Sequence, residues 1–534
     1  MKLVPEFSPD ILKDKLTVTK IDSDISHLTA NQKKVINYLI KCAEVLGEVF
    51  LLQKHPDNLI IREKITEKKD PSLLLYFNVM SGPFNHFDGD KPYLEGIKKN
   101  DKAGFYPHDM TKSEWEQSLN KNSDKMEDFI SPYHKIVREE GRLKAVPYSE
   151  AYKEYLIRAS EILKDAAQYA DNYSLKSYLS AQANAFVTND FFEADIRWIQ
   201  LSGNDIVPLL GAYEYYEDKF LGYKTSFTGL IGVKNRNEIN KLSHIIKMLD
   251  ILQSKLPIPE HYKKQKRGSI SEIEIVDLLY NSGDSRCPIP TAAFNLPNSH
   301  KIRSEFGSKK VLLYNIMKAK YDSVLMPIAE VILTKKDQAK ATFTSYFNYI
   351  LMHEISHELG ISFVKNSSGE SKEVSFFLKD LYTVIEEAKA DVMGIFLMIF
   401  LQKQNIITET SYTDICIVYL INLIRAIRFG VENPHGLASL IQINFLIEEG
   451  VFLQEADKKL SVDFHKFEKN LERLLTIILT LQGEGDYGKT SDFIKDYSKM
   501  NKDVKKYLDL VKKLPVDILP WYPKAGEKKL FLTN

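Results

Sequence analysis

Two segments in the second half of the chain combine apolar positions at helical spacing with a few charged ones. From Phe343 to Met352 the chain has no Gly or Pro and keeps apolar residues three to four positions apart. This pattern predicts a buried helix, which we expect Gly360 to end. A second apolar segment, from about Val374 to Gln402, predicts another buried helix. Acidic residues that face inward from such a helix are costly unless a metal or a partner satisfies them.

The remaining pattern predicts a helix-rich α+β protein. Helical periodicity extends over residues 149–169 and 238–256, and short β-rich segments occur at 225–233 and 310–316. Residues 73–106 carry several Gly and Pro among aromatic residues, which suggests strands and long loops. We find no internal repeat and no low-complexity tract.

The first apolar segment runs into the motif His353-Glu354-Ile355-Ser356-His357. An α-helix turns by about 100° per residue, so side chains four positions apart face the same way and both imidazoles can bind one metal ion. Glu354 points slightly aside, where it can take a proton from a metal-activated water and pass it to a leaving group. The motif therefore indicates metal-dependent hydrolysis.

The second apolar segment supplies a third ligand. A hydrolytic zinc site usually has three protein ligands and keeps a fourth position open. Glu387 can bind the metal, while Asp391, four residues later, can accept the second ring N–H of a zinc histidine. The neighbouring Glu386 is expected, like Asp391, to surround the ligands without binding the metal. Its specific role stays open. Either segment alone also fits a core helix with internally bonded polar groups or a solvated face, but the two together favour one Zn²⁺ ion per chain.

Beyond these motifs, the chain resembles the dipeptidyl peptidase III family of zinc metallopeptidases, in the bacterial form with the five-residue HEISH motif. Five stretches in the family's order carry the resemblance: Glu214–Asp218, Asn295–Asn298, the HEISH helix, Glu386–Asp391 and Asn433–Ala438.

For the chemistry, the resemblance implies that Glu354 is the general base and acid. Tyr216 matches a tyrosine that donates a hydrogen bond to the substrate carbonyl, and His435 matches a histidine near the tetrahedral intermediate. Fixed donors of this kind stabilise developing negative charge. The implied zinc ligands are His353, His357 and Glu387.

For the substrate, the resemblance implies that Glu214, Asn295 and Asn298 bind the free amino terminus, since a carboxylate and amide oxygens suit an ammonium group. The implied function is a zinc-dependent exopeptidase that releases dipeptides from the free N-terminus of short peptides. The individual residues also have ordinary interpretations: Tyr216 fits an aromatic cluster, the two asparagines fit a turn, and His435 fits a helix start.

Two departures from the family pattern leave rival functions open. Many members have one more residue between the two histidines, and an arginine that anchors the substrate's carboxyl end is expected where this chain has Ser439. Without that guanidinium group, preference for peptide length is weakened. The rivals are a zinc hydrolase of the same fold with a different or non-peptide substrate, and a catalytically inactive peptide-binding protein.

The resemblance also implies two lobes separated by a wide cleft. We expect residues 1–232 to form a mixed α/β lobe with a small β-barrel, completed by about 280–325 and the C-terminal tail. Residues 233–279 and 326–510 are expected to form a mainly helical, zinc-binding catalytic lobe.

Composition adds limits on partners and location. The 534 residues include 72 basic and 72 acidic side chains and a formal net charge of zero, so no overall field attracts nucleic acid or an anionic membrane. The three cysteines, Cys42, Cys287 and Cys416, are too few and too far apart for a disulfide framework. The first ten residues lack the apolar core of a signal peptide. We expect a cytoplasmic protein that is a monomer or a weak homodimer.

Overall fold

The helix-rich α+β architecture that the sequence predicts is present in the computed structural model, which describes residues 2–98, 101–263, 272–365, 370–455 and 459–526. The chain divides into unit 1, formed by Met1–Arg236, Ser271–Ile316 and Asp517–Asn534, and unit 2, formed by Asn237–Ile270 and Met317–Val516. The borders expected near 232, 279 and 325 lie at 236, 270 and 316 in these units. The middle border precedes a strand, Glu272–Gly283, which pairs with the sheet of unit 1.

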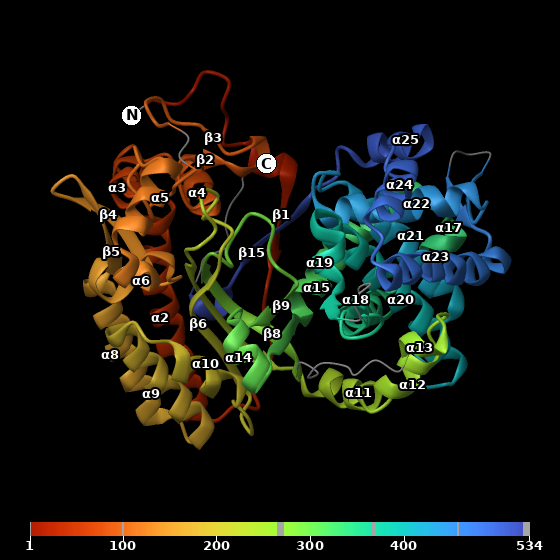
Figure 1. The fold of residues 1–534 in the computed structure, drawn as a ribbon, viewed down its shortest axis with the longest axis horizontal. Coiled ribbons are helices and arrows are strands. Elements are labelled where there is room, and N and C mark those ends of the chain that lie inside the picture. Colours follow the sequence, from red (N-terminus) through yellow and green to blue (C-terminus); the bar gives the residue numbers. More distant parts are fainter. Residues whose placement is uncertain (1, 99–100, 264–271, 366–369, 456–458, 527–534) are drawn as a thin grey trace. The chain divides into compact units, whose positions relative to one another are not determined.

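Unit 1 is built around a five-stranded mixed sheet in the order β6-β7-β8-β10-β9 (Figure 1). All its pairings are antiparallel except that of β8 with β10. The expected small barrel is thus a curled half-barrel with β6 and β9 at its edges. Nearly every residue of β6 and β7 is buried, as in strands that are covered on both faces. The sheet consists of β6 Ile206–Glu214, β7 Ser226–Lys234, β8 Glu272–Gly283, β9 Ala293–Leu296 and β10 Lys309–Leu313.

Helix α2 covers this sheet by packing on β7 and β8, and α8 packs on both α2 and α9. The two ends of the chain meet in a parallel pair, in which Leu16 lies opposite Asp517. The helices of unit 1 are α1 Ile11–Lys15, α2 Ala30–Lys54, α3 Asn58–Glu67, α4 Pro71–Met80, α5 Lys112–Lys121, α6 Met126–Ile130, α7 Tyr148–Ala151, α8 Lys153–Tyr169, α9 Tyr173–Thr188, α10 Phe192–Ile199 and α14 His300–Phe306. Its other strands are β1 Leu16–Lys20, β2 Phe84–Asn85, β3 Lys91–Pro92, β4 His134–Glu139, β5 Arg142–Pro147 and β15 Asp517–Trp521.

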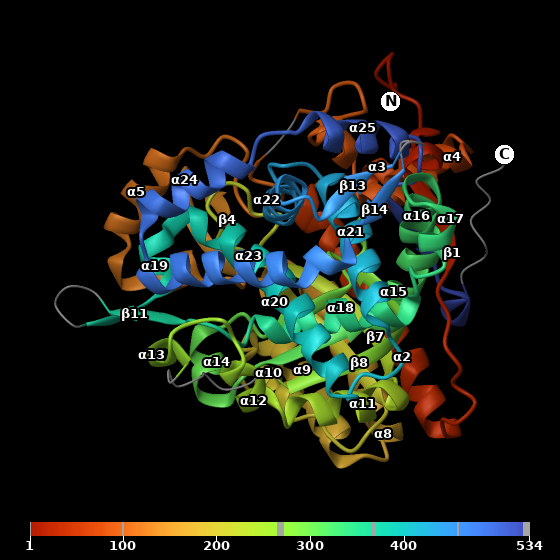
Figure 2. The same cartoon turned by 90° about the vertical axis from the view of Figure 1, so that its right-hand side faces the viewer.

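Unit 2 is mainly helical. Its centre is α20, which packs against α18, α22 and α23, while α21 packs on α18 and α22 (Figure 2). Helix α11 begins at the border between the units at residue 236. Helix α15 spans another border, at residue 316. The helices are α11 Arg236–Ile246, α12 Leu249–Ser254, α13 Glu260–Lys263, α15 Tyr314–Lys320, α16 Met326–Ile332, α17 Lys335–Gln338, α18 Phe343–Ser356, α19 Val374–Leu378, α20 Tyr382–Lys403, α21 Tyr412–Ile427, α22 Pro434–Glu448, α23 Phe464–Glu484, α24 Tyr487–Tyr497 and α25 Lys502–Val511. Its short strands are β11 Phe363–Lys365, β12 Ser371–Glu373, β13 Phe452–Gln454 and β14 Leu460–Val462.

Several predicted elements are interrupted. The segment expected as one helix from Val374 to Gln402 breaks at Lys379, whose φ of +51° is outside the helical region. The helix expected to run up to Gly360 ends at Ser356 instead. The predicted helix at 238–256 is two helices, α11 and α12. Part of the region expected as strands and loops, Pro71–Met80, is helix α4, whose start is capped by Asp70.

No helix among the described residues is long and apolar enough to cross a lipid bilayer. The apolar runs 392–401 and 415–421 lie in α20 and α21, and most of their residues are buried.

Candidate active site

Helix α18 brings the two histidines of the motif to its C-terminal end in unit 2. The helix starts at Thr342, whose hydroxyl accepts a hydrogen bond from the backbone N–H of Ser345. His353 lies in the last full turn, and His357 is the residue that follows the last helical one. The backbone of His357 keeps helical angles, with φ of −63° and ψ of −28°, so the four-residue spacing still aligns the two rings.

Helix α18 can lie close to α20 because α20 contains a glycine at the crossing. A Cβ atom on Gly394 would lie 2.9 Å from the backbone nitrogen of His353, a distance that real Cβ atoms essentially never show. The absence of a side chain at Gly394 therefore allows the histidine helix to approach the acidic helix.

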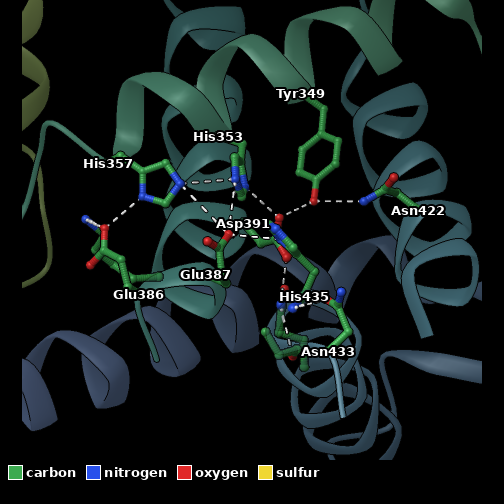
Figure 3. A network of polar contacts seen from close by, with 12 residues as sticks. Tyr349, His353, His357, Glu386, Glu387, Asp391, Asn422, Asn433 and His435 are labelled. Atoms are coloured by element: carbon green, nitrogen blue, oxygen red, sulfur yellow. Dashed lines mark hydrogen bonds and ion pairs between the residues drawn. The ribbon is translucent and has the colours of Figure 1, made fainter. Parts of the chain in front are cut away.

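The side chains of His353, His357 and Glu387 converge on one point (Figure 3). The Nε2 atoms of the two histidines are 3.2 Å apart. Oε2 of Glu387 lies 3.5 Å from Nε2 of His353 and 3.9 Å from Nε2 of His357. Two nitrogen ligands of a tetrahedral zinc ion are roughly 3.3 Å apart. The spacing of these three atoms therefore fits the zinc ligands that the sequence predicts.

Glu387 places a buried negative charge at this point. Its Oε2 atom is buried and makes no hydrogen bond of ordinary geometry with any group in the described part of the chain. Burial alone would raise the pKa of Glu387, but the contacts with His353 and His435 outweigh burial and hold that pKa far below its ordinary value. A buried, ionised carboxylate beside two imidazole nitrogens is a suitable set of donors for zinc.

The other nitrogen of each ring contacts a carboxylate of α20. Nδ1 of His353 donates to Oδ1 of Asp391, and Nδ1 of His357 donates to Oε1 of Glu386, both over 2.8 Å. A carboxylate on Nδ1 fixes the tautomer in which Nε2 is free to bind a metal. The structure thus brings both predicted outer carboxylates to the histidines and gives Glu386 a specific contact.

A hydrogen-bonded chain extends from Asp391 into the core. Tyr349 donates to Oδ1 of Asp391 over 2.5 Å, and Gln442 donates to Oδ2 over 2.9 Å. Asn422 donates to the hydroxyl of Tyr349, and Tyr419 donates to Gln442. These residues were not predicted. Asn422 and Gln442 are buried polar residues within the apolar helices α21 and α22, which is the signal that could have drawn attention to them.

Glu354 and His435, the other predicted residues of the reaction, also lie in unit 2. Glu354 follows His353 in α18 and is partly exposed. His435 stands in the first turn of α22, where the side chain of Asn433 accepts a hydrogen bond from its backbone N–H. Nδ1 of His435 makes an ion-pair contact of 3.0 Å with Oε2 of Glu387. This contact raises the pKa of His435, against the effect of burial.

The predicted amine-binding residues lie together in unit 1, around a cavity of about 510 Å³. Glu214 ends β6, directly after an irregularity in register between Ala212 and Glu214. Such a bulge re-aims the side chains beside it. Asn298 donates to the carbonyl of Tyr213 over 2.9 Å and to Oε2 of Glu214 over 3.4 Å. Burial raises the pKa of Glu214, and the bond from Asn298 partly opposes this.

Asn295 and Tyr216 line the same cavity. Oδ1 of Asn295 is buried and makes no hydrogen bond with the described residues. The side chain of Tyr216 is 73% exposed, which excludes a core role for this residue. The sequence did not predict the other ionisable groups of the cavity, which include Lys54, Glu217 and Asp284. Burial and the neighbouring Glu217 raise the pKa of Asp284 to about 8.

Ser439 lies on the core side of α22. The residue is 1% exposed, and its hydroxyl makes no hydrogen bond with the described residues. A small, buried side chain thus occupies the position at which the family resemblance implies an arginine.

Comparisons with known proteins agree with this geometry. Residues 122–375 match the model of peptidase family M49. The solved structure of DPP III from Caldithrix abyssi is similar with a TM-score of 0.94 and 37% identity, over 96% of this chain and 98% of that one. The dipeptidyl-peptidase III structure from Corallococcus sp. strain EGB is similar with a TM-score of 0.82 and 30% identity, over 97% of both chains. Nudix hydrolase 3 of Arabidopsis thaliana is 30% identical over 98% of this chain and 74% of its own length.

Proposed function

Since the chain belongs to the dipeptidyl peptidase III family, peptidase family M49, and is therefore a peptidase, we propose that it is a zinc-dependent exopeptidase that releases dipeptides from the free N-terminus of short peptides. The observation that carries this proposal is the convergence of the two histidine Nε2 atoms and Oε2 of Glu387.

In the proposed reaction, His353, His357 and Glu387 hold one zinc ion, which when bound supplies a Lewis acid that polarises the scissile carbonyl and makes water more acidic. Glu354 accepts a proton from the attacking water and transfers it to the nitrogen of the leaving peptide. The position of Glu354 next to His353, with its side chain partly exposed, supports this role.

Tyr216 and His435 are proposed to stabilise the negative charge that develops on the substrate's carbonyl oxygen. A phenol O–H and a protonated imidazole are both donors that suit this task. The exposure of Tyr216 supports a role toward substrate, and the contact with Glu387 that raises the pKa of His435 favours the protonated imidazole.

Glu214, Asn295 and Asn298 are proposed to bind the substrate's ammonium group. The carboxylate of Glu214 supplies the charge, and the amide oxygens supply further acceptors. The cavity that they line is large enough for the first residue of a peptide, which supports binding of an amino end rather than a lone ammonium ion. Because α22 has Ser439 where a guanidinium group is expected, we propose that the carboxyl end of the substrate contributes less to recognition than the amino end.

The location and assembly of the protein are also proposals. All three cysteines are free, and two of them, Cys42 and Cys416, are buried. This state fits the reducing environment of the cytoplasm. We propose a monomer or a weak homodimer, which sedimentation velocity at several protein concentrations would test.

The proposed function is tested with a fluorogenic dipeptidyl naphthylamide that has a free amine and with its N-acetylated counterpart. We expect fluorophore release that stops when a chelator removes the metal and returns when zinc is added back. The acetylated substrate should not be cleaved, because it has no ammonium group for Glu214. Equal cleavage of both substrates would reject the amine clamp, and cleavage of other peptides alone would support the rival hydrolase.

A further inference from the structure

Lys389 is a buried cation beside the proposed metal site for which the proposed reaction has no use. The residue is 2% exposed and lies in α20, between Glu387 and Asp391 in the sequence. Its ammonium group contacts Oε1 of Glu386 over 2.7 Å and donates to the carbonyl oxygen of Leu359 over 3.0 Å. A buried lysine is rare unless it is paired, so these two contacts account for its charge and for part of its hydrogen bonding.

Both contacts of Lys389 bear on His357. Because α18 ends at Ser356, no further helical turn holds the chain after His357. Leu359 lies in the turn that follows, next to Gly360, whose φ is +94°. The bond from Lys389 to Leu359 thus ties this turn to α20. Glu386, the other partner of Lys389, is the carboxylate that accepts the hydrogen bond from Nδ1 of His357.

The two histidines are therefore supported differently. Asp391, the partner of His353, is held by the neutral donors Tyr349 and Gln442. Glu386, the partner of His357, is held by the charged Lys389 and by Gln482, which donates to Oε2 over 2.9 Å. Only the support of His357 includes a full positive charge.

Lys389 also supplies a positive charge next to three carboxylates of α20. Glu386, Glu387 and Asp391 place three negative charges beside the two imidazoles. Lys389, which contacts Oε1 of Glu386 over 2.7 Å, compensates one of them without being a metal ligand. Buried charges are tolerated when they are paired and hydrogen-bonded in this manner.

We propose that Lys389 is a positioning residue of the metal site, which holds Glu386 and the turn after His357 so that Nε2 of His357 faces the zinc ion before the ion binds. This inference rests on the proposed zinc site. It concerns metal affinity and not the identity of the substrate.

The test is the zinc dissociation constant of the full chain, measured by competition with a chromophoric chelator. Lys389→Met removes the charge and both contacts, and we expect it to weaken zinc binding about 10- to 100-fold, as is typical when an outer partner of a metal ligand is lost. Lys389→Arg keeps the charge and the donors, and we expect it to restore most of the affinity. The visible spectrum of the Co²⁺-loaded protein should change in Lys389→Met and not in Lys389→Arg.

Lys309 of unit 1 provides a matched control. It is also 2% exposed, pairs with Glu272 over 3.5 Å and donates to the carbonyl oxygen of Leu201 over 3.1 Å. Lys309→Met therefore removes a similar buried cation from the same chain. We expect this variant to be less stable and yet to bind zinc with the affinity of the wild type.

Equal zinc affinity in folded Lys389→Met and the wild type would overturn the inference, and so would an equal loss in Lys309→Met. If Lys389→Met does not fold, Lys389→Gln, which keeps one donor without the charge, carries the same test: at least a tenfold loss supports the inference, and no loss overturns it. A wild-type chain that binds no stoichiometric zinc would instead reject the metal site on which the inference rests.

Discussion

Nδ1 of His353 donates a hydrogen bond to Oδ1 of Asp391 over 2.8 Å, and this contact leaves Nε2 of the same ring facing Glu387. The orientation of a metal-binding imidazole is thus set by a residue that does not touch the metal. Asp391 is in turn held by a tyrosine and a glutamine from two other helices. The geometry of the metal site therefore depends on the packing of α18, α20 and α22.

Replacing Tyr349 with Phe removes the hydroxyl that links Asp391 to Asn422. We expect zinc binding to weaken about tenfold, because Asp391 loses a donor. We also expect the free energy of unfolding to fall by about 1–3 kcal/mol, because Asn422 is left without that acceptor. Zinc competition and chemical denaturation would measure the two effects. Tyr419→Phe, which alters the network one step further from His353, should affect zinc binding less; an equal effect would contradict the assigned order.

Replacing Glu354 with Gln should remove the proton acceptor while leaving the metal ligands in place. General base catalysis contributes about 10²- to 10⁴-fold to such rates, so we expect a loss of kcat in this range with one zinc ion still bound. Steady-state kinetics and metal analysis would check both parts. Glu358→Gln, four residues further along the chain, is a control that should keep most of the activity. Full activity in Glu354→Gln would reject the proposed base.

Replacing Glu214 with Gln should raise KM for free-amine peptides about 10- to 100-fold with little change in kcat, since a hydrogen bond to a charged group contributes about 1.5–3 kcal/mol. Because burial raises the pKa of Glu214, this carboxylate takes up a proton at a higher pH than an exposed glutamate does. KM of the wild type should therefore rise as the pH is lowered, and KM of Glu214→Gln should rise less. Parallel pH profiles of the two proteins would argue against an ionic contact.

Asp284 should make stability depend on pH. Its pKa is raised from 3.8 to about 8 by burial and by Glu217 and Glu214, against the effect of Lys54. The folded chain thus keeps a proton that the unfolded chain loses above about pH 4, so this group lowers the free energy of unfolding as pH rises toward 8, by at most about 1.4 kcal/mol per pH unit. Asp284→Asn should therefore gain stability relative to the wild type between pH 5 and pH 8. Thermal unfolding of both proteins at several pH values would test this. A stability difference that stays constant with pH would contradict the assignment.

The cluster of His353, His357, Glu387 and Asp391 could be predicted because its residues lie in two short stretches of the sequence. The spacing of His353 and His357 and that of Glu387 and Asp391 are properties of a single helix, and helical periodicity is visible in the chain. The role of Glu386 could not be predicted, because it depends on where Lys389 and Gln482 lie. Gln482 belongs to α23 and is about a hundred residues away in the sequence. Its contact with Glu386 depends on tertiary packing alone.

The same distinction explains the errors in the fold. The break at Lys379 follows from a backbone angle that no Gly or Pro marks in the sequence. Helix α18 ends at Ser356, four residues before the Gly360 that the sequence marks as its end. Strand β8 was not predicted, although its first four residues, Glu272 to Ile275, alternate polar and apolar side chains. The rest of the strand is mostly buried and lacks this alternation. Helix α4 was hidden by the Gly, Pro and aromatic residues that follow it.

The cavity of Glu214, Asn295 and Asn298 is formed by unit 1 alone, and no ligand of the proposed zinc ion belongs to that unit. If the clamp acts as proposed, capture of a peptide's amino end and cleavage of its backbone are separable properties of the chain. A protein stripped of zinc would then still bind peptides reversibly by their amino ends. It would hold, without cleavage, the same peptides that the metal-loaded form hydrolyses.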